Sequence, residues 1–171
     1  MLPETDIEII TYTYYDSPVG ILKIGGTEHY ISEISFAAKE TEPAHNTSVP
    51  SAILHKCTEQ LIEYFLGTRQ IFDIPYHQSG TAFQEKVWGK LSEIPFGATM
   101  SYGELAKKMG DPKVVRAAAA ANGKNKLMIL VPCHRVIGAD RSLVGYAGGM
   151  TFKKWLLQHE FRIKHGEQTL F

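Results

Sequence analysis

The sequence predicts an α+β protein with a small strand-rich N-terminal α/β domain, residues 1–78, and a mainly helical C-terminal domain, residues 79–171. Three observations lead to this prediction. β-Branched and aromatic residues dominate the N-terminal segments. The apolar pattern then changes from that of strands to that of helices near residues 74–80. Beyond that point, two short helices around a glycine-containing turn, followed by a hairpin-like wing, match a winged helix-turn-helix domain.

The N-terminal domain begins with three predicted strands. The run IEIITYTYY, residues 7–15, favours a first strand because β-branched and aromatic side chains suit a pleated surface. The turn cluster DSPVG follows it. ILKI, residues 21–24, and the segment that ends in ISEISF predict a second and a third strand, which we expect to be joined at Gly25 and Gly26. A polar loop over residues 39–51 completes this part.

A helix is predicted next, because apolar side chains recur three and four positions apart and Gly67 can end it. The apolar stripe consists of Leu54, Cys57, Leu61 and Phe65. We therefore expect Cys57 to be a buried core residue with no chemical role. Residues 74–80, IPYHQSG, are the predicted linker between the domains.

The helices of the C-terminal domain carry start signals. Thr81 with Gln84, and Ser101 with Glu104, are candidate capping boxes, and Asp111 before a proline is a candidate N-cap. The apolar face of the first helix comprises Phe83, Val87, Leu91 and Ile94, and the PFG stretch at 95–97 is expected to stop it. Gly110 and Gly123 should end the second and third helices, and a last helix should begin at Thr151.

The net charge of zero conceals an asymmetry between the two halves. Residues 1–80 hold four Lys/Arg and eleven Asp/Glu, a balance of −7, and residues 81–171 hold fourteen and seven, a balance of +7. The basic half indicates a polyanionic partner, although two domains that simply attract each other would show the same pattern.

The row of alanines at 117–121 also has two possible explanations. Small residues allow close packing on the protein's own core, or close approach to a DNA groove.

The two cysteines, Cys57 and Cys133, are expected to be free thiols in a cytoplasmic protein, because no export signal precedes them. No apolar run is long enough for a membrane span, and no ligand cluster indicates a metal. Cys133 lies in ILVPCHRVIG, behind a proline and before His134 and Arg135. The thiolate is the reactive form, and nearby donors or positive charge would favour it. A buried structural cysteine is the alternative.

The motif PCHRVIG, with NGKN before it and GYAGG and WLLQHE after it, resembles the O6-alkylguanine-DNA alkyltransferases, also called methylated-DNA–protein-cysteine methyltransferases. The resemblance covers residues 81–165, about half of the chain, with the motifs in the same order. It implies a ribonuclease H-like N-terminal domain and a winged helix-turn-helix C-terminal domain. It also implies a monomeric, single-turnover repair protein without cofactor or metal. The implied partner is double-stranded DNA that contains O6-alkylguanine, with O4-alkylthymine as a second candidate substrate.

The resemblance implies a role for each matching residue. Cys133 is the nucleophile, His134 the base acting through a water molecule, and Glu160 the group that orients the histidine. Tyr102 would bind the flipped base, and Asn125 would brace the turn that carries the cysteine. The implied DNA contacts are Arg116, as a wedge in the duplex, with Ala117, Tyr102, Lys113 and Lys124. The implied substrate pocket consists of Val136, Tyr146, Ala147 and Arg135.

Some of these residues also have a simpler structural explanation, and the sequence departs from the family pattern at two places. Tyr102 could be a packing residue, Arg116 a solvated helix residue, and Glu160 a surface partner of Lys164 four positions later. The alanine helix lacks a glycine that often interrupts it in the family, and Lys126 stands where proline is common. Two other functions compete: a winged-helix DNA-binding regulator with a redox-sensing cysteine, and, more weakly, a cysteine hydrolase. The hydrolase would need a distant histidine, and the papain-type signature is absent.

Overall fold

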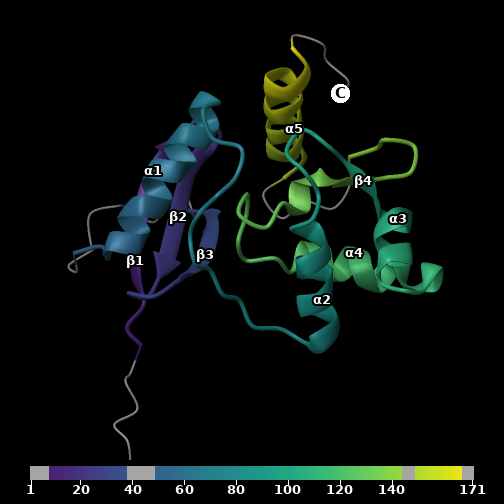
Figure 1. The fold of residues 1–171 in the computed structure, drawn as a ribbon, viewed down its shortest axis with the longest axis horizontal. Helices are drawn as coiled ribbons and strands as arrows, with labels where there is room; N and C mark the ends of the chain where they lie inside the picture. The colour runs from purple at the N-terminus through teal and green to yellow at the C-terminus, as the bar shows by residue number, and fades with distance from the viewer. Residues whose placement is uncertain (1–7, 38–48, 144–148, 167–171) are drawn as a thin grey trace, which may run out of the picture.

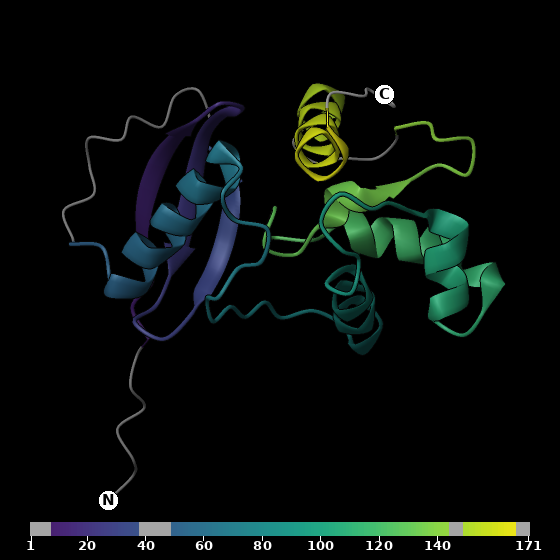
Figure 2. The same ribbon diagram turned by 45° about the horizontal axis from the view of Figure 1, so that its top comes forward.

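The computed structural model describes residues 8–37, 49–143 and 149–166, which form an N-terminal and a C-terminal lobe (Figure 1). The N-terminal lobe is an antiparallel sheet in the order β1 (Thr11–Ser17), β2 (Gly20–Gly26) and β3 (Ile31–Phe36). Helix α1 (Ala52–Leu66) lies across one face of this sheet, as Figures 1 and 2 both show. The predicted α+β class and division into a sheet lobe and a helical lobe are confirmed.

Helix α1 follows the predicted pattern. Its stripe of Leu54, Cys57, Leu61 and Phe65 is buried against the sheet. The Ser51 hydroxyl accepts a hydrogen bond from a first-turn N–H, and Gly67, at φ 85°, ends the helix in the left-handed conformation. Burial raises the pKa of Cys57 to about 12, which leaves this thiol protonated and inert at neutral pH.

The predicted position of the second turn was wrong. Gly25 and Gly26 belong to β2, with a register shift between them, and residues 27–30 form the turn. Thr27 closes that turn, since its hydroxyl oxygen accepts from the N–H groups of His29 at 3.0 Å and Tyr30 at 3.2 Å. Gly25 is required by close packing, because a Cβ atom there would lie 2.6 Å from Cε1 of Tyr12. The glycine pair is therefore a bulge in a strand.

The C-terminal lobe contains the predicted capped helices. In order these elements are α2 (Ala82–Leu91), β4 (Met100–Ser101), α3 (Tyr102–Lys108), α4 (Val115–Gly123), β5 (Val136–Ile137) and α5 (Met150–His165). Both capping boxes, Thr81 with Gln84 and Ser101 with Glu104, are formed. Asp111 caps a 3-10 turn, Pro112–Val114, that leads into α4. Helix α2 ends at Leu91, earlier than its apolar face suggested, although Ile94 is still buried.

The segment predicted as a wing forms strand β5 and a turn. Strand β5 pairs in parallel with β4, and the N–H of Gly138 donates to the carbonyl oxygen of Ser142 at 2.8 Å. Residues 144–148 lie outside the described part of the chain. The β4–β5 pairing brings the start of α3 close to the segment that contains Cys133. No helix among the described residues is long and apolar enough to cross a lipid bilayer.

The segment predicted as a linker is held against the N-terminal sheet. The N–H of Ile31 donates to the Pro75 carbonyl, and the N–H of His77 donates to the Ile31 carbonyl, both at 2.9 Å. Further along β3, the N–H of Ile34 donates to the Lys126 carbonyl at 2.8 Å. The chain around residues 75–77 and around residues 126–128 therefore covers the outer edge of β3. One apolar core continues through both lobes. The domain boundary at residue 78 stays a prediction.

Candidate active site

Cys133 begins a short 3-10 turn, Cys133–Arg135. Only 5% of Cys133 is exposed. The chain reaches it through a tight turn in which Ile129 has φ 72°, a conformation that β-branched residues rarely adopt. The N–H of Val131 donates to the Leu127 carbonyl at 2.9 Å and closes this turn. The backbone before the thiol is therefore constrained, and local strain of this kind is often found at functional sites.

Asn125 ties the two sides of this turn together. Its Nδ2 donates to the Val131 carbonyl at 2.8 Å, and its Oδ1 accepts from the N–H of Leu127 at 3.1 Å. Gln78, in the segment between the lobes, donates to the same Oδ1 at 2.8 Å and accepts from the N–H of Lys126 at 2.9 Å. A proline at position 126 would have no N–H for this contact. The N–H of Lys126 thus adds a hydrogen bond between the C-terminal lobe and the segment that links the two lobes.

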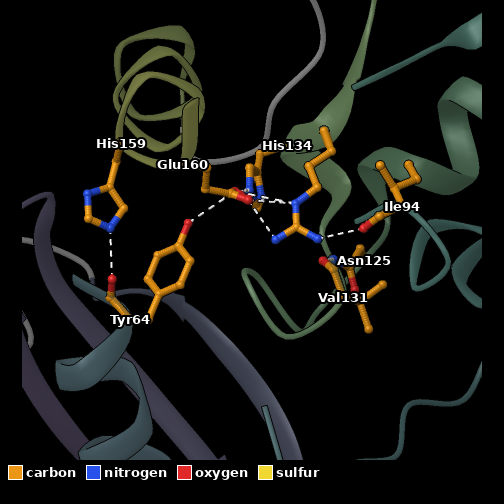
Figure 3. A network of polar contacts seen from close by, with 8 residues as sticks. Tyr64, Ile94, Asn125, Val131, His134, His159 and Glu160 are labelled. Carbon is orange, nitrogen blue, oxygen red and sulfur yellow. Dashed lines mark hydrogen bonds and ion pairs between the residues drawn. The ribbon is translucent and has the colours of Figure 1, made fainter. Parts of the chain in front are cut away.

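His134 and Glu160 form a fully buried pair (Figure 3). The imidazole Nε2 lies 2.5 Å from Oε2 of Glu160, and the two side chains are 0% and 1% exposed. Nδ1 of His134 has no protein hydrogen-bond partner among the described residues. The alternative that Glu160 pairs with Lys164 on the surface is wrong, because its carboxylate is turned inward to the cysteine segment.

Two further residues bind the same carboxylate. Nε of Arg135 donates to Oε1 of Glu160 at 2.6 Å, and Nη1 donates to the Ile94 carbonyl at 2.7 Å. The Tyr64 hydroxyl, from α1, donates to Oε2 at 3.3 Å. The guanidinium of Arg135, predicted as part of the substrate pocket, is thus engaged with Glu160 and Ile94, and its pocket role stays a prediction.

The charged state of this pair follows from its surroundings. Burial opposes ionisation of Glu160, but His134 and Arg135 outweigh it and lower the pKa of the carboxyl to about 2. Burial lowers the pKa of His134 below its usual value, although Glu160 acts in the opposite direction. At neutral pH we therefore assign a neutral imidazole next to a carboxylate, with Arg135 as the charged partner. A neutral imidazole can accept a proton.

The resting state of Cys133 differs from the activated thiolate that the sequence suggested. Burial raises the pKa of Cys133 above its usual value, so the thiol is protonated at neutral pH. Hydrogen bonds from the Asn125 side chain and from backbone N–H groups, together with the charge of Lys153, act in the opposite direction. The thiol must therefore lose its proton during the reaction, with these groups stabilising the anion that forms.

Lys153 is a site residue that the sequence did not reveal. It is 0% exposed, and its ammonium donates to the Val136 carbonyl at 2.5 Å and lies 5.7 Å from the centre of the Tyr102 ring. Burial lowers its pKa to about 8, partly opposed by Cys133. Tyr102 is half-buried at the start of α3, and burial and the nearby Cys133 raise its pKa. A lysine in an otherwise amphipathic helix gave no signal of this location.

The alanine helix α4 has two different faces. Ala118 and Ala121 are buried, and Nε1 of Trp88 in α2 donates to the Ala121 carbonyl at 2.9 Å. Arg116 and Ala117 are exposed on another face. Close packing therefore explains part of the alanine row, while the rest of the helix surface is free for a partner.

The remaining predicted site residues fall into three groups. Lys113 and Lys124 are exposed near the two ends of α4, and their contact with DNA stays a prediction. Val136 is fully buried beside the cysteine turn. Tyr146 and Ala147 lie outside the described residues, so the pocket wall assigned to them stays a prediction. No group of three or more His, Cys, Asp or Glu side chains in the described part of the chain is placed to hold a metal ion.

Comparisons with known proteins agree over both lobes. Residues 10–77 match the model of the 6-O-methylguanine DNA methyltransferase ribonuclease-like domain, and residues 82–162 match that of the DNA binding domain. The chain is 40% identical to a methylated-DNA–protein-cysteine methyltransferase of Methanosarcina acetivorans, over 87% of this chain and 97% of that one. It is 41% identical to the constitutive enzyme of Bacillus subtilis, over 92% and 98%.

The fold is likewise similar to solved structures. The crystal structure of Mycobacterium tuberculosis OGT in complex with DNA superposes with a TM-score of 0.80 at 40% identity. The similarity covers 89% of this chain and 93% of that one.

Proposed function

The chain belongs to the 6-O-methylguanine DNA methyltransferase family, and we propose that it repairs DNA by moving the alkyl group of O6-alkylguanine to its own Cys133. The observation that carries the assignment to Cys133 is the buried succession of thiol, imidazole and carboxylate at Cys133, His134 and Glu160. The order matches that of a nucleophile, a base and an orienting group in covalent catalysis. The regulator with a redox-sensing cysteine is not supported, because the curated relatives are methyltransferases.

In the proposed reaction, His134 takes the proton of the Cys133 thiol through a bridging water at Nδ1. Glu160 holds Nε2 and stabilises the imidazolium that forms. The sulfur then bonds to the alkyl carbon while the bond from that carbon to O6 of guanine breaks. The electron pair of that bond stays on the base. A hydrogen bond from Tyr102 helps the base to leave as neutral guanine, which gains one proton in balance with the one that His134 accepted.

The product is a thioether on Cys133, which offers no good leaving group. We therefore propose that each molecule acts once. The raised pKa of the resting thiol fits this use, since a protonated thiol on a residue that is only 5% exposed is protected from unrelated electrophiles. The thiolate is needed only once, when a base occupies the site.

Access to O6 requires the nucleotide to leave the stacked duplex, at a cost of a few kcal/mol. We propose that Arg116, exposed at the start of α4, fills the gap in the duplex, and that Ala117 allows the helix to approach closely. Lys113 and Lys124 would contact phosphates, which gives affinity that depends on salt and not on sequence. Such contacts suit a repair protein because lesions occur at any sequence. We further propose that the protein acts as a monomer in the cytoplasm.

Duplex DNA that carries O6-methylguanine with a labelled methyl group tests this function. We expect about one methyl per protein molecule, on Cys133, with no second turnover. Cys133→Ala should take up no label, although it should still bind the same DNA. A wild-type protein that binds DNA without becoming labelled would support the regulator, and labelled product released in many turnovers would support a hydrolase.

A further inference from the structure

The N-terminal lobe contributes one side chain directly to the His134–Glu160 pair. Tyr64, on the buried face of α1, is 0% exposed, and its hydroxyl donates to Oε2 of Glu160 at 3.3 Å. Oε2 is also the oxygen that binds Nε2 of His134 at 2.5 Å. Figure 3 shows the Tyr64 hydroxyl and the imidazole on this one carboxylate. The tyrosine is 96 positions from the glutamate in sequence, so only the fold brings them together.

The tyrosine itself is held firmly in place. Its ring packs edge-on against Phe65, with centroids 5.2 Å apart, and against Phe96 of the C-terminal lobe at 6.0 Å. Its backbone carbonyl accepts from Nε2 of His159 at 2.8 Å, and that imidazole stacks on Trp155 at 4.8 Å. Helices α1 and α5 are therefore joined twice at this level, through the Tyr64 main chain and through its side chain.

We propose that Tyr64 is a positioning residue for alkyl transfer: its hydroxyl fixes Oε2 of Glu160, so that His134 keeps the orientation needed to take the thiol proton. The inference rests on the proposed function of Cys133. The two carboxylate oxygens differ in their partners: Nε of Arg135 lies 2.6 Å from Oε1 and 3.3 Å from Oε2, and Oε2 also binds the imidazole and the phenol. Without the phenol, the carboxylate can rotate toward Arg135 and weaken its hold on the imidazole. The N-terminal lobe thus helps to set the geometry of the reacting groups.

The charged and titratable groups around the His134–Glu160 pair come from three elements. They are Tyr64 on α1, Cys133 and Arg135 in the cysteine turn, and Lys153 and His159 on α5. Tyr64→Phe removes a hydrogen-bond donor and no charge from this set. Because Glu160 raises the pKa of His134, a carboxylate that holds the imidazole less firmly should let this pKa fall.

The test measures methyl transfer from O6-methylguanine, as the free nucleoside and in duplex DNA, under single-turnover conditions between pH 5 and 9. For Tyr64→Phe we expect the plateau rate constant to fall about five- to tenfold. The midpoint of the acid limb should move down by about half a pH unit. The labelled fraction at completion should stay near one, because amplitude reports folded protein and the rate constant reports chemistry. Tyr15→Phe is the matched control, since Tyr15 packs on Phe65 in the same aromatic cluster and does not reach Glu160.

Three outcomes are distinguished. A wild-type protein that takes up no methyl overturns the proposed function itself. An active wild type with an unchanged rate constant and pH midpoint in Tyr64→Phe overturns only the role of Tyr64. A lower amplitude with an unchanged rate constant also overturns it, because that result indicates a purely structural residue.

If Tyr64→Phe does not fold, NMR of the wild-type protein provides the test. The Tyr64 hydroxyl proton should exchange slowly and show a contact with the proton on His134 Nε2. A hydroxyl proton in fast exchange would overturn the proposal.

Discussion

Replacement of Glu160 by glutamine tests the buried pair most directly. The carboxylate binds His134, Arg135 and Tyr64, and it is 1% exposed. Glutamine has nearly the same shape but no charge. It leaves the guanidinium of Arg135 without its counter-charge in a buried position, where an unpaired charge is strongly unfavourable.

The magnitude follows from the pKa of the carboxyl, which is lowered from 4.5 to about 2. At 1.36 kcal/mol per pKa unit, this shift corresponds to about 3 kcal/mol with His134 protonated, and to less at neutral pH, where the imidazole carries no charge. Because the folded-state pKa lies below the unfolded value, the stabilisation is fully present above pH 4.5 and is lost as the pH falls toward 2. Breaking a buried ion pair by removing one partner costs a similar amount, about 3–5 kcal/mol.

Urea unfolding, followed by tryptophan fluorescence between pH 3 and 7, measures this contribution. At pH 7 the free energy of unfolding of Glu160→Gln should be about 3 kcal/mol below that of the wild type, because the buried ion pair with Arg135 is broken. The difference should shrink as the pH drops below 4.5. Glu63→Gln is the control: Glu63 pairs with Arg69 at the surface, at 3.3 Å, so its loss should cost less than about 1 kcal/mol. Equal effects of the two substitutions, or a difference that does not change with pH, would refute the reasoning.

Three other substitutions probe separate parts of the site. Arg116→Ala should slow methyl transfer from duplex DNA far more than from the free nucleoside, and equal losses in the two rate constants would remove the wedge role. Lys153→Met should raise the pKa of Cys133 further and slow transfer from the nucleoside below pH 8. Above pH 8 the wild-type lysine loses its charge, so the difference in rate constant between wild type and variant should become smaller. A difference that stays constant across the pH–rate profile would contradict this. Asn125→Ala should lower the free energy of unfolding by about 2 kcal/mol in urea titrations, since it breaks the bond to the Val131 carbonyl, and an unchanged midpoint would show that the turn holds without it.

Local features of the fold could be predicted well from the sequence. The capping boxes at Thr81 and Ser101 and the buried stripe of α1 depend on neighbours in the chain, and each is observed. The second turn was misplaced for a physical reason. The glycines at 25 and 26 serve close packing in a bulged strand, and sequence alone does not separate that use from a turn.

The site residues could be predicted only where they belong to the motifs shared with the family. Cys133, His134 and Glu160 came from the family resemblance, and the structure places the last two in contact. Gln78 and Tyr64 could not be found in this way, because their contacts join segments 47 and 96 positions apart. The direction of the pKa shift of Cys133 could not be predicted either, since it depends on burial in the folded structure.

The short pairing of β4 with β5 joins Met100 to Val136 and Ser101 to Ile137. Tyr102 directly follows the first strand, and the Cys133–Arg135 turn directly precedes the second. A strand that slips by one residue turns its side chains to the opposite face. Adding or deleting a single amino acid at the start of β5 would therefore move the Tyr102 phenol away from the Cys133 sulfur, although both residues would still be present. Indels at this point should be absent from any collection of active variants of this chain.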